Sequence, residues 1–127
     1  MSDTRATTHI TSIRTVAIPV ADQEQALAFY IGTLGFEKRL DAPMGPGERW
    51  VEVAPAGAAA TLALVRRPDG GATGIDTGVR LTSEDVQADH DALQAGGVDV
   101  DAEVIPYPVP MFSFRDPDGN RLVIVGQ

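Results

Sequence analysis

The sequence predicts an α+β fold built from two tandem βαβββ modules. Strand-like alternation precedes an amphipathic helix, the same pattern returns later in the chain, and turn residues separate the remaining apolar runs. The segment "IRTVAIPVAD" aligns with "IDTGVRLTSED", so that Asp22 falls on Asp85 about 63 residues later. A repeat of this length indicates a duplicated module, because solenoid units are shorter. The expected divisions are a flexible tail at residues 1–11 and one domain at 12–127, with module one at about 12–68 and module two at about 74–127.

The first module should open with a strand over residues 13–20, where aliphatic side chains recur, and Pro19 places it near a strand end or a sheet edge. Asp22 is expected to cap the following helix, with Gln25 completing a capping box. Apolar residues at helical spacing continue to Gly35, a typical helix stop. Three further strands are expected at residues 36–40, 49–53 and 61–65, separated by a Pro/Gly loop at 42–47 and a second loop at 55–59.

The second module repeats this order. A strand over residues 75–82 should lead to a helix that Ser83 can cap and that ends at Gly96. The last three strands are expected at residues 100–104, 111–114 and 121–125. Between the final two, "DPDGN" reads as a rigid turn, since proline presets one φ angle and glycine takes the left-handed position.

Composition narrows the function classes. The chain has 127 residues, 43% of them hydrophobic, and a net charge of −8, which argues against binding a nucleic-acid backbone. It has no cysteine, so disulfides, thiolate nucleophiles and Cys-based metal sites are excluded. No apolar run is long enough to cross a membrane, and the polar start "MSDTRATTHITS" carries no visible secretory signal. A cytoplasmic location is the resulting expectation.

The two modules, the helix ending "FYIGTLGF" and the final "FRDPDGNRL" together resemble the vicinal oxygen chelate superfamily. This superfamily includes glyoxalase I, extradiol dioxygenases, fosfomycin-resistance proteins and bleomycin-binding proteins. The resemblance implies a curved mixed sheet around a cleft, with the helices on the outer face. It also implies a homodimer.

The resemblance implies that members that bind a metal ion hold it with a His on each module's first strand and a Glu on a last strand, often joined by a Glu from elsewhere. In this chain those positions are Thr15, Gly78 and Val123, which lack the donor strength that divalent metals require. Only Glu52, in "WVEVA", falls on a position that the resemblance assigns to a ligand. We therefore expect no metal and no other cofactor.

Glu52 shares a strand face with Trp50. On a cleft face Glu52 could accept a hydrogen bond from a ligand, or act as a general base with a pKa raised by burial; on the outer face it would be a solvated charge. Arg80 lies opposite Val79 and Leu81, on the face that the resemblance makes the cleft. It could bind a carboxylate or phosphate of a ligand, or pair with Glu52 or Asp76.

The leading hypothesis is a metal-independent protein that holds a small organic molecule in an apolar cleft, as bleomycin-binding proteins do. The alternatives are a lyase, isomerase or dioxygenase that uses an atypical metal site or Glu52 as base, and a structural dimer with a filled cavity. His90 is expected to be structural, packed at its helix. The expected ligand-binding residues are Thr15, Trp50, Glu52, Gly78, Arg80, Phe112 and Val123.

Overall fold

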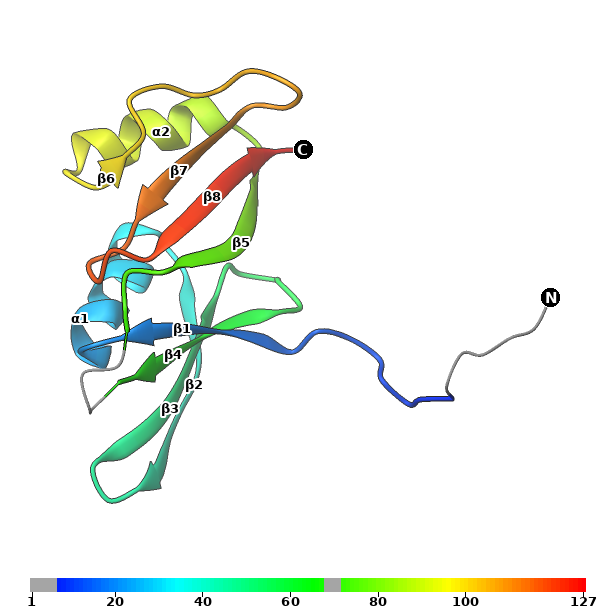
Figure 1. Ribbon diagram of the computed structural model, residues 1–127, viewed down its shortest axis with the longest axis vertical. Coiled ribbons are helices and arrows are strands. Elements are labelled where there is room, and N and C mark those ends of the chain that lie inside the picture. The colour runs from blue at the N-terminus through cyan, green and yellow to red at the C-terminus, as the bar shows by residue number, and fades with distance from the viewer. Residues whose placement is uncertain (1–6, 68–71) are drawn as a thin grey trace.

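The computed structural model describes residues 7–67 and 72–127, and confirms the α+β fold of two βαβββ modules (Figure 1). In module one, strand β1 is parallel to β4, and the remaining pairs are antiparallel, in the sheet order β1-β4-β3-β2. Its elements are β1 (Thr15–Val20), α1 (Gln23–Leu27), the π-helical η1 (Ala28–Thr33), β2 (Glu37–Gly45), β3 (Glu48–Ala54) and β4 (Thr61–Arg66).

Module two repeats this topology in the order β5-β8-β7-β6, again with one parallel pair, β5 with β8. The two sheets stay separate and do not close into a barrel over the residues that the structure describes. The elements are β5 (Asp76–Ser83), α2 (Val86–Ala95), β6 (Asp99–Val100), β7 (Met111–Arg115) and β8 (Arg121–Gly126). Within the described ranges, no helix is both long and apolar enough to span a membrane.

The predicted Asp22 cap is confirmed in the first module, whereas the cap of the second module lies two residues beyond the predicted one. Asp22 accepts hydrogen bonds from the backbone N–H groups of Glu24 and Gln25, and so caps α1. In module two the cap is Asp85, whose side chain accepts from the N–H of Ala88. Ser83, the predicted cap, instead accepts from the N–H of Asp85 and holds the turn that precedes the helix.

Two predicted boundaries are wrong. The expected loop at 42–47 is mostly strand, because β2 runs on to Gly45 and leaves only a tight turn before β3. Pro43 fits there because β2 is an edge strand, where a missing N–H costs no ladder bond, and the register shifts beside it. The strand expected at 100–104 contracts to Asp99–Val100, since the chain then leaves the sheet edge for a proline-rich loop.

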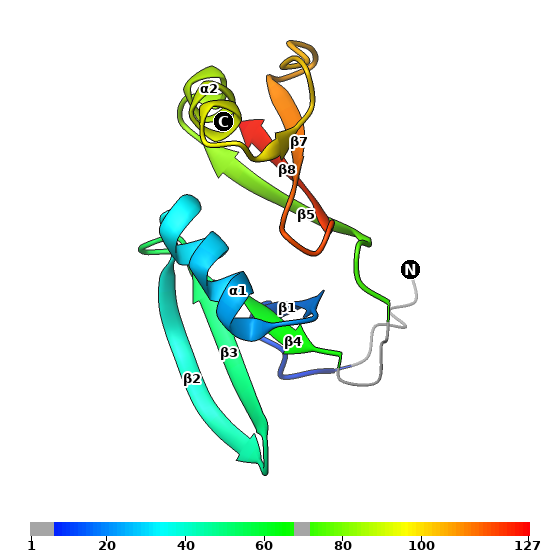
Figure 2. The same cartoon turned by 90° about the vertical axis from the view of Figure 1, so that its left-hand side faces the viewer.

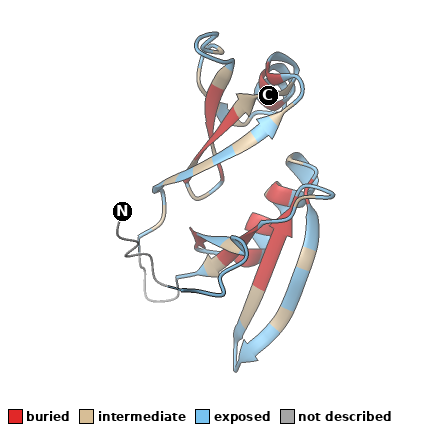
Figure 3. Ribbon diagram, turned by 90° about the vertical axis from the view of Figure 1, so that its right-hand side faces the viewer, coloured by how far each residue is buried: buried red, intermediate tan, exposed pale blue. Residues whose placement is uncertain are grey.

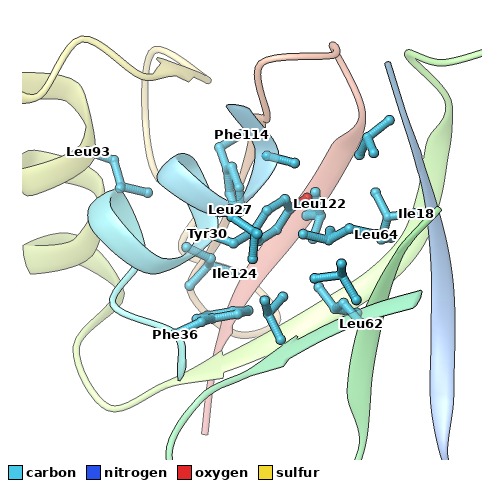
Figure 4. Packing of buried hydrophobic residues seen from close by; sticks show 14 of the residues in the cluster. Ile18, Leu27, Tyr30, Phe36, Leu62, Leu64, Leu93, Phe114, Leu122 and Ile124 are labelled. Atoms are coloured by element: carbon cyan, nitrogen blue, oxygen red, sulfur yellow. The ribbon is translucent and has the colours of Figure 1, made fainter. Parts of the chain in front are cut away.

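One hydrophobic core joins the two modules. Helix α1 covers one face of the first sheet, and η1 continues toward module two (Figures 2 and 4). The Phe29 ring lies 6.2 Å from that of Phe114 on β7, and Tyr30 is fully buried in the same cluster. Buried residues gather on β3, β4, α1, β7 and β8, whereas β2 and β5 are exposed over much of their length (Figure 3).

The "DPDGN" turn is held by its own side chains. Asp116 Oδ1 accepts from the backbone N–H groups of Asp118 and Asn120, and Gly119 takes a φ of 82°. This confirms the structural role predicted from the turn residues.

The same turn also fastens module two to module one, which the sequence did not reveal. Asn120 Nδ2 donates to the Pro19 carbonyl oxygen at 2.7 Å, and Asp118 Oδ1 accepts from the Ala21 N–H at 3.0 Å. The Tyr30 hydroxyl donates to Asp116 Oδ2 at 2.8 Å. Burial, followed by the nearby Asp116 charge, raises the pKa of Tyr30 far above its ordinary value, so this hydroxyl remains a donor.

Asn120→Ala should therefore destabilise the fold by about 3 kcal/mol, because a fully buried side chain loses several hydrogen bonds and leaves their partners unsatisfied. Urea unfolding would measure the change. Gln94→Ala on the exposed side of α2 is the control, expected within about 0.5 kcal/mol of wild type. Equal effects of the two substitutions would contradict the role of the turn as the joint between modules.

Candidate ligand-binding faces

Glu52 is the centre of a hydrogen-bonded network on the face of β3 that points away from the core. Its neighbours Val51 and Val53 are buried in the hydrophobic cluster, so alternation puts Glu52 on the opposite face. Only 3% of Glu52 is exposed. Its Oε2 accepts from Trp50 Nε1 at 2.7 Å, and its Oε1 accepts from the Thr61 hydroxyl at 2.8 Å.

Thr15 belongs to the same network. Its hydroxyl lies 2.8 Å from Thr61 Oγ1 and donates to the Thr61 carbonyl oxygen at 3.2 Å, since the two residues are register partners on β1 and β4. The Arg14 guanidinium forms an ion pair with the Glu52 carboxylate, with Nη2 at 3.6 Å from Oε2. We call Thr15, Trp50, Glu52 and Thr61 the Glu52 face. It unites three of the predicted site residues; Thr61 is the one that sequence reasoning missed.

The pKa of Glu52 is lowered, so the expectation of a raised pKa was wrong. The hydrogen bond from Trp50 is the largest cause, and the bond from Thr61 and the charge of Arg14 act in the same direction against desolvation. Glu52 is therefore an anion at neutral pH with both oxygens already engaged. Such a carboxylate is poorly suited to take up a proton. It instead holds the half-buried Trp50 indole on the sheet face by a hydrogen bond.

The second face carries Arg80. Strand pairing places Arg80, Val123 and Ser113 in one row across β5, β8 and β7, and we call these three the Arg80 face. Arg80 is exposed, and its guanidinium donates only to the Gly78 carbonyl oxygen among its hydrogen bonds to described residues. Neither predicted ion pair forms in this part of the chain. Asp76 pairs with Arg121 at 3.1 Å, and Glu52 pairs with Arg14.

Gly78 has a backbone reason for being glycine. Its φ is 72°, in the left-handed region that favours glycine, and the β5–β8 register breaks between Asp76 and Arg80. The Thr77 hydroxyl accepts from the Val79 N–H across the kink. The glycine thus allows the bulge that precedes Arg80.

Phe112 does not lie on either face, which corrects its place among the predicted ligand-binding residues. It is 1% exposed, and its ring meets the ring of His90 on α2 edge to face at 4.9 Å. The alternation along β7 sends Phe112 to the helix side and Ser113 to the outer face. His90 is buried as predicted, with Nε2 at 2.7 Å from the Asp101 carbonyl oxygen.

The residues at the positions where the resemblance implies metal ligands do not fit a divalent ion. Thr15, Gly78 and Val123 supply no imidazole or carboxylate, and both oxygens of Glu52 are taken by Trp50 and Thr61. Within residues 7–67 and 72–127 no three His, Cys, Asp or Glu side chains are grouped to hold a metal.

Two cavities adjoin these faces. A small one of about 190 Å³ lies beside Trp50 and is bordered by Met44, Val65 and Arg66. A larger one of about 590 Å³, the intermodule groove, lies between the first sheet and β5. The lining of this groove includes Gly78, Arg80 and Thr61. It does not include Thr15, Trp50 or Glu52. Its apolar lining includes Ile13, Val16, Val53, Ala58, Ala60, Leu62, Val79 and Leu81.

Acid should weaken the contribution of Glu52 to stability. A lowered folded-state pKa gives stability that is present above the unfolded pKa, and this stability is lost as pH falls through the lower folded value, in the range below about 4.5. The difference in unfolding free energy between wild type and Glu52→Gln should therefore shrink as pH falls from 6 to 3. Glu103→Gln, which alters an exposed carboxylate, controls for removal of one charge. A difference that grows on acidification would contradict the assigned direction.

Comparison with known proteins agrees with the architecture. The family model described as Glyoxalase/Bleomycin resistance protein/Dioxygenase superfamily matches residues 12–124. The uncharacterized protein YetH of Bacillus subtilis (strain 168) is 33% identical over 117 residues, which is 91% of this chain and 98% of YetH.

Two crystal structures extend the likeness. A superfamily member from Sphaerobacter thermophilus DSM 20745 is 36% identical with a TM-score of 0.86, covering 94% of this chain and 100% of that one. TnmS3, an antibiotic binding protein from Streptomyces sp. CB03234, is 37% identical with a TM-score of 0.80, covering 94% and 98%. With its two βαβββ modules and this match along nearly its whole length, the chain belongs to the glyoxalase/bleomycin resistance protein/dioxygenase superfamily.

Proposed function

We propose that this protein is a metal-independent, homodimeric binding protein that holds a small, largely apolar organic molecule, such as an antibiotic, against its Glu52 face. The observation that carries the proposal is the use of Glu52. Glu52 is the one carboxylate at a position where the resemblance implies a metal ligand. Its oxygens accept hydrogen bonds from Trp50 and Thr61, so that it orients the Trp50 indole as a binding surface.

The chemistry of both faces suits a ligand of this kind. A fixed indole offers a large contact area at little entropic cost. The small cavity beside Trp50 adds the apolar side chains of Met44 and Val65, together with polar and charged side chains that include Arg66. The Arg80 guanidinium could receive a carboxylate or another acceptor of the ligand. TnmS3, a relative of similar length, is described as antibiotic binding, which supports this ligand class.

The homodimer supplies the second half of the site. In one chain the Glu52 face and the Arg80 face belong to separate sheets, and the intermodule groove reaches Arg80 without reaching Trp50 or Glu52. A second copy would set its Arg80 face against the Glu52 face of the first and enclose the ligand between them. Each dimer would then contain two equivalent sites, as twofold symmetry requires.

Trp50 is the only tryptophan, so its fluorescence reports directly on the site. With a panel of small, largely apolar aromatic antibiotics, we expect saturable quenching without added metal for at least one compound. Glu52→Ala should weaken binding at least tenfold, because the indole loses its acceptor. Arg80→Ala should weaken binding of anionic compounds, whereas Arg67→Ala, which removes an exposed arginine elsewhere, should not.

Metal analysis tests the other half of the proposal. Protein exposed to Zn²⁺, Ni²⁺, Mn²⁺ or Fe²⁺ and then desalted should retain far less than one ion per chain. Retention near one ion per chain that is abolished in Glu52→Ala would overturn the proposal. It would favour instead a lyase, isomerase or dioxygenase of the same superfamily.

A further inference from the structure

A third cavity, of about 300 Å³, lies between the two modules on the side of their helices. Module one borders it with residues 33–36, after the end of η1, and with the loop that follows β3. Module two borders it with parts of β5, α2 and β8. Figure 2 shows the C-terminal end of η1 next to the end of β5 and to α2. We call this space the helix-side cavity. Its volume is at the lower end of the range for pockets that bind small molecules.

The helix-side cavity is distinct from both ligand faces. On β5 and β8 the register pairs Arg80 with Val123 and Leu81 with Ile124, so alternation turns the second pair toward the helices. The lining of the cavity includes Leu81 and Ile124 and no residue of the Glu52 face or the Arg80 face. Four residues border both this cavity and the intermodule groove: Phe36, Pro55, Leu81 and Thr82.

Asp89 is the one charged residue in the lining of the helix-side cavity. It lies in the first turn of α2 and is half-buried. The Ser83 hydroxyl donates to Asp89 Oδ2 at 2.5 Å, which fixes the orientation of the carboxylate. Within residues 7–67 and 72–127, Asp89 Oδ1 accepts no hydrogen bond and the carboxylate has no ion-pair partner. One oxygen is therefore left to accept from a ligand.

The C-terminal end of η1 adds negative potential to the same cavity. Helices α1 and η1 follow one another without a break over residues 23–33, and Thr33, Leu34 and Gly35 border the cavity. The C-terminus of a helix carries a partial negative charge, which a nearby cation stabilises. The last turn of η1 has no basic side chain, and no described Lys, Arg or His lines the cavity. The site is thus complementary to a cation that the protein itself does not supply.

We propose that the helix-side cavity binds a small organic amine, with the ammonium group on the Asp89 carboxylate and the apolar body against Phe36, Leu93 and Ile124. An ammonium bonded to a carboxylate makes a charge-assisted hydrogen bond, stronger than one between neutral groups. The three apolar side chains belong to the core cluster, so this end of the cavity is a dry surface for a ring or a branched alkyl group. The site is independent of the proposed function, since it uses neither ligand face.

Three probes of nearly equal size test the preference for a cation. 2-Phenylethylamine, 2-phenylethanol and phenylacetate share a ring on a short arm, and at neutral pH they are cationic, neutral and anionic. In isothermal titration calorimetry we expect the amine to bind at least tenfold more tightly than the alcohol, and phenylacetate to show no binding. Equal affinities for the amine and the alcohol overturn the proposal. So does the absence of saturable amine binding in the millimolar range.

Asp89→Asn tests the position of the ammonium group. The substitution keeps the shape of the side chain and an acceptor for Ser83, but removes the charge. The affinity for the amine should fall at least tenfold, whereas that for the alcohol should stay the same. Asp91→Asn, at an exposed position of the same helix outside the cavity lining, is the control and should leave both affinities unchanged. Amine binding that survives Asp89→Asn overturns the proposal, because the amine then binds elsewhere.

Ala92→Leu tests the cavity itself, because it adds a bulky side chain to the lining at a position where a helix accepts leucine readily. Amine binding should be lost with an unchanged circular dichroism spectrum, whereas Ala88→Leu, outside the lining, should retain it. Full binding in Ala92→Leu contradicts the assigned site. Quenching of Trp50 by an antibiotic should be the same in Ala92→Leu as in wild type, since Ala92 is not part of the Glu52 face. Failure of either binding reaction therefore leaves the other to be judged by itself.

Discussion

The docking of the "DPDGN" turn onto module one is the contact on which the rest of the structure depends. The duplicated module gives two sheets, and no described strand of one pairs with a strand of the other. Asn120 and Asp118 tie the turn to the backbone at the end of β1, and Asp116 ties it to Tyr30. Because these groups are largely buried, the arrangement is costly to break. It holds the hydrophobic core closed between η1 and β7.

The two modules share a fold but present different chemistry on their outer faces. Module one buries an anion whose hydrogen bonds are satisfied internally, and the benefit is a rigid indole. Module two exposes the cation of Arg80 beside a glycine kink. A buried carboxylate that already accepts strong bonds is stable as an anion and has little capacity for proton transfer. In this structure Glu52 supports the Trp50 indole through their hydrogen bond.

The sequence by itself determined the duplicated βαβββ order, the Asp22 cap, the self-supporting turn and the lack of metal donors at Thr15, Gly78 and Val123, because periodicity, capping and donor chemistry are local. Only the tertiary structure decided that Phe112 faces the core and that Thr61 joins Glu52. It also decided that the pKa of Glu52 lies below its ordinary value and that the DPDGN turn is hydrogen-bonded to module one. The physical reason is that these features depend on how distant segments pack. Packing decides which residues of other strands become hydrogen-bond partners, and which side of a sheet a helix covers. No local pattern encodes either.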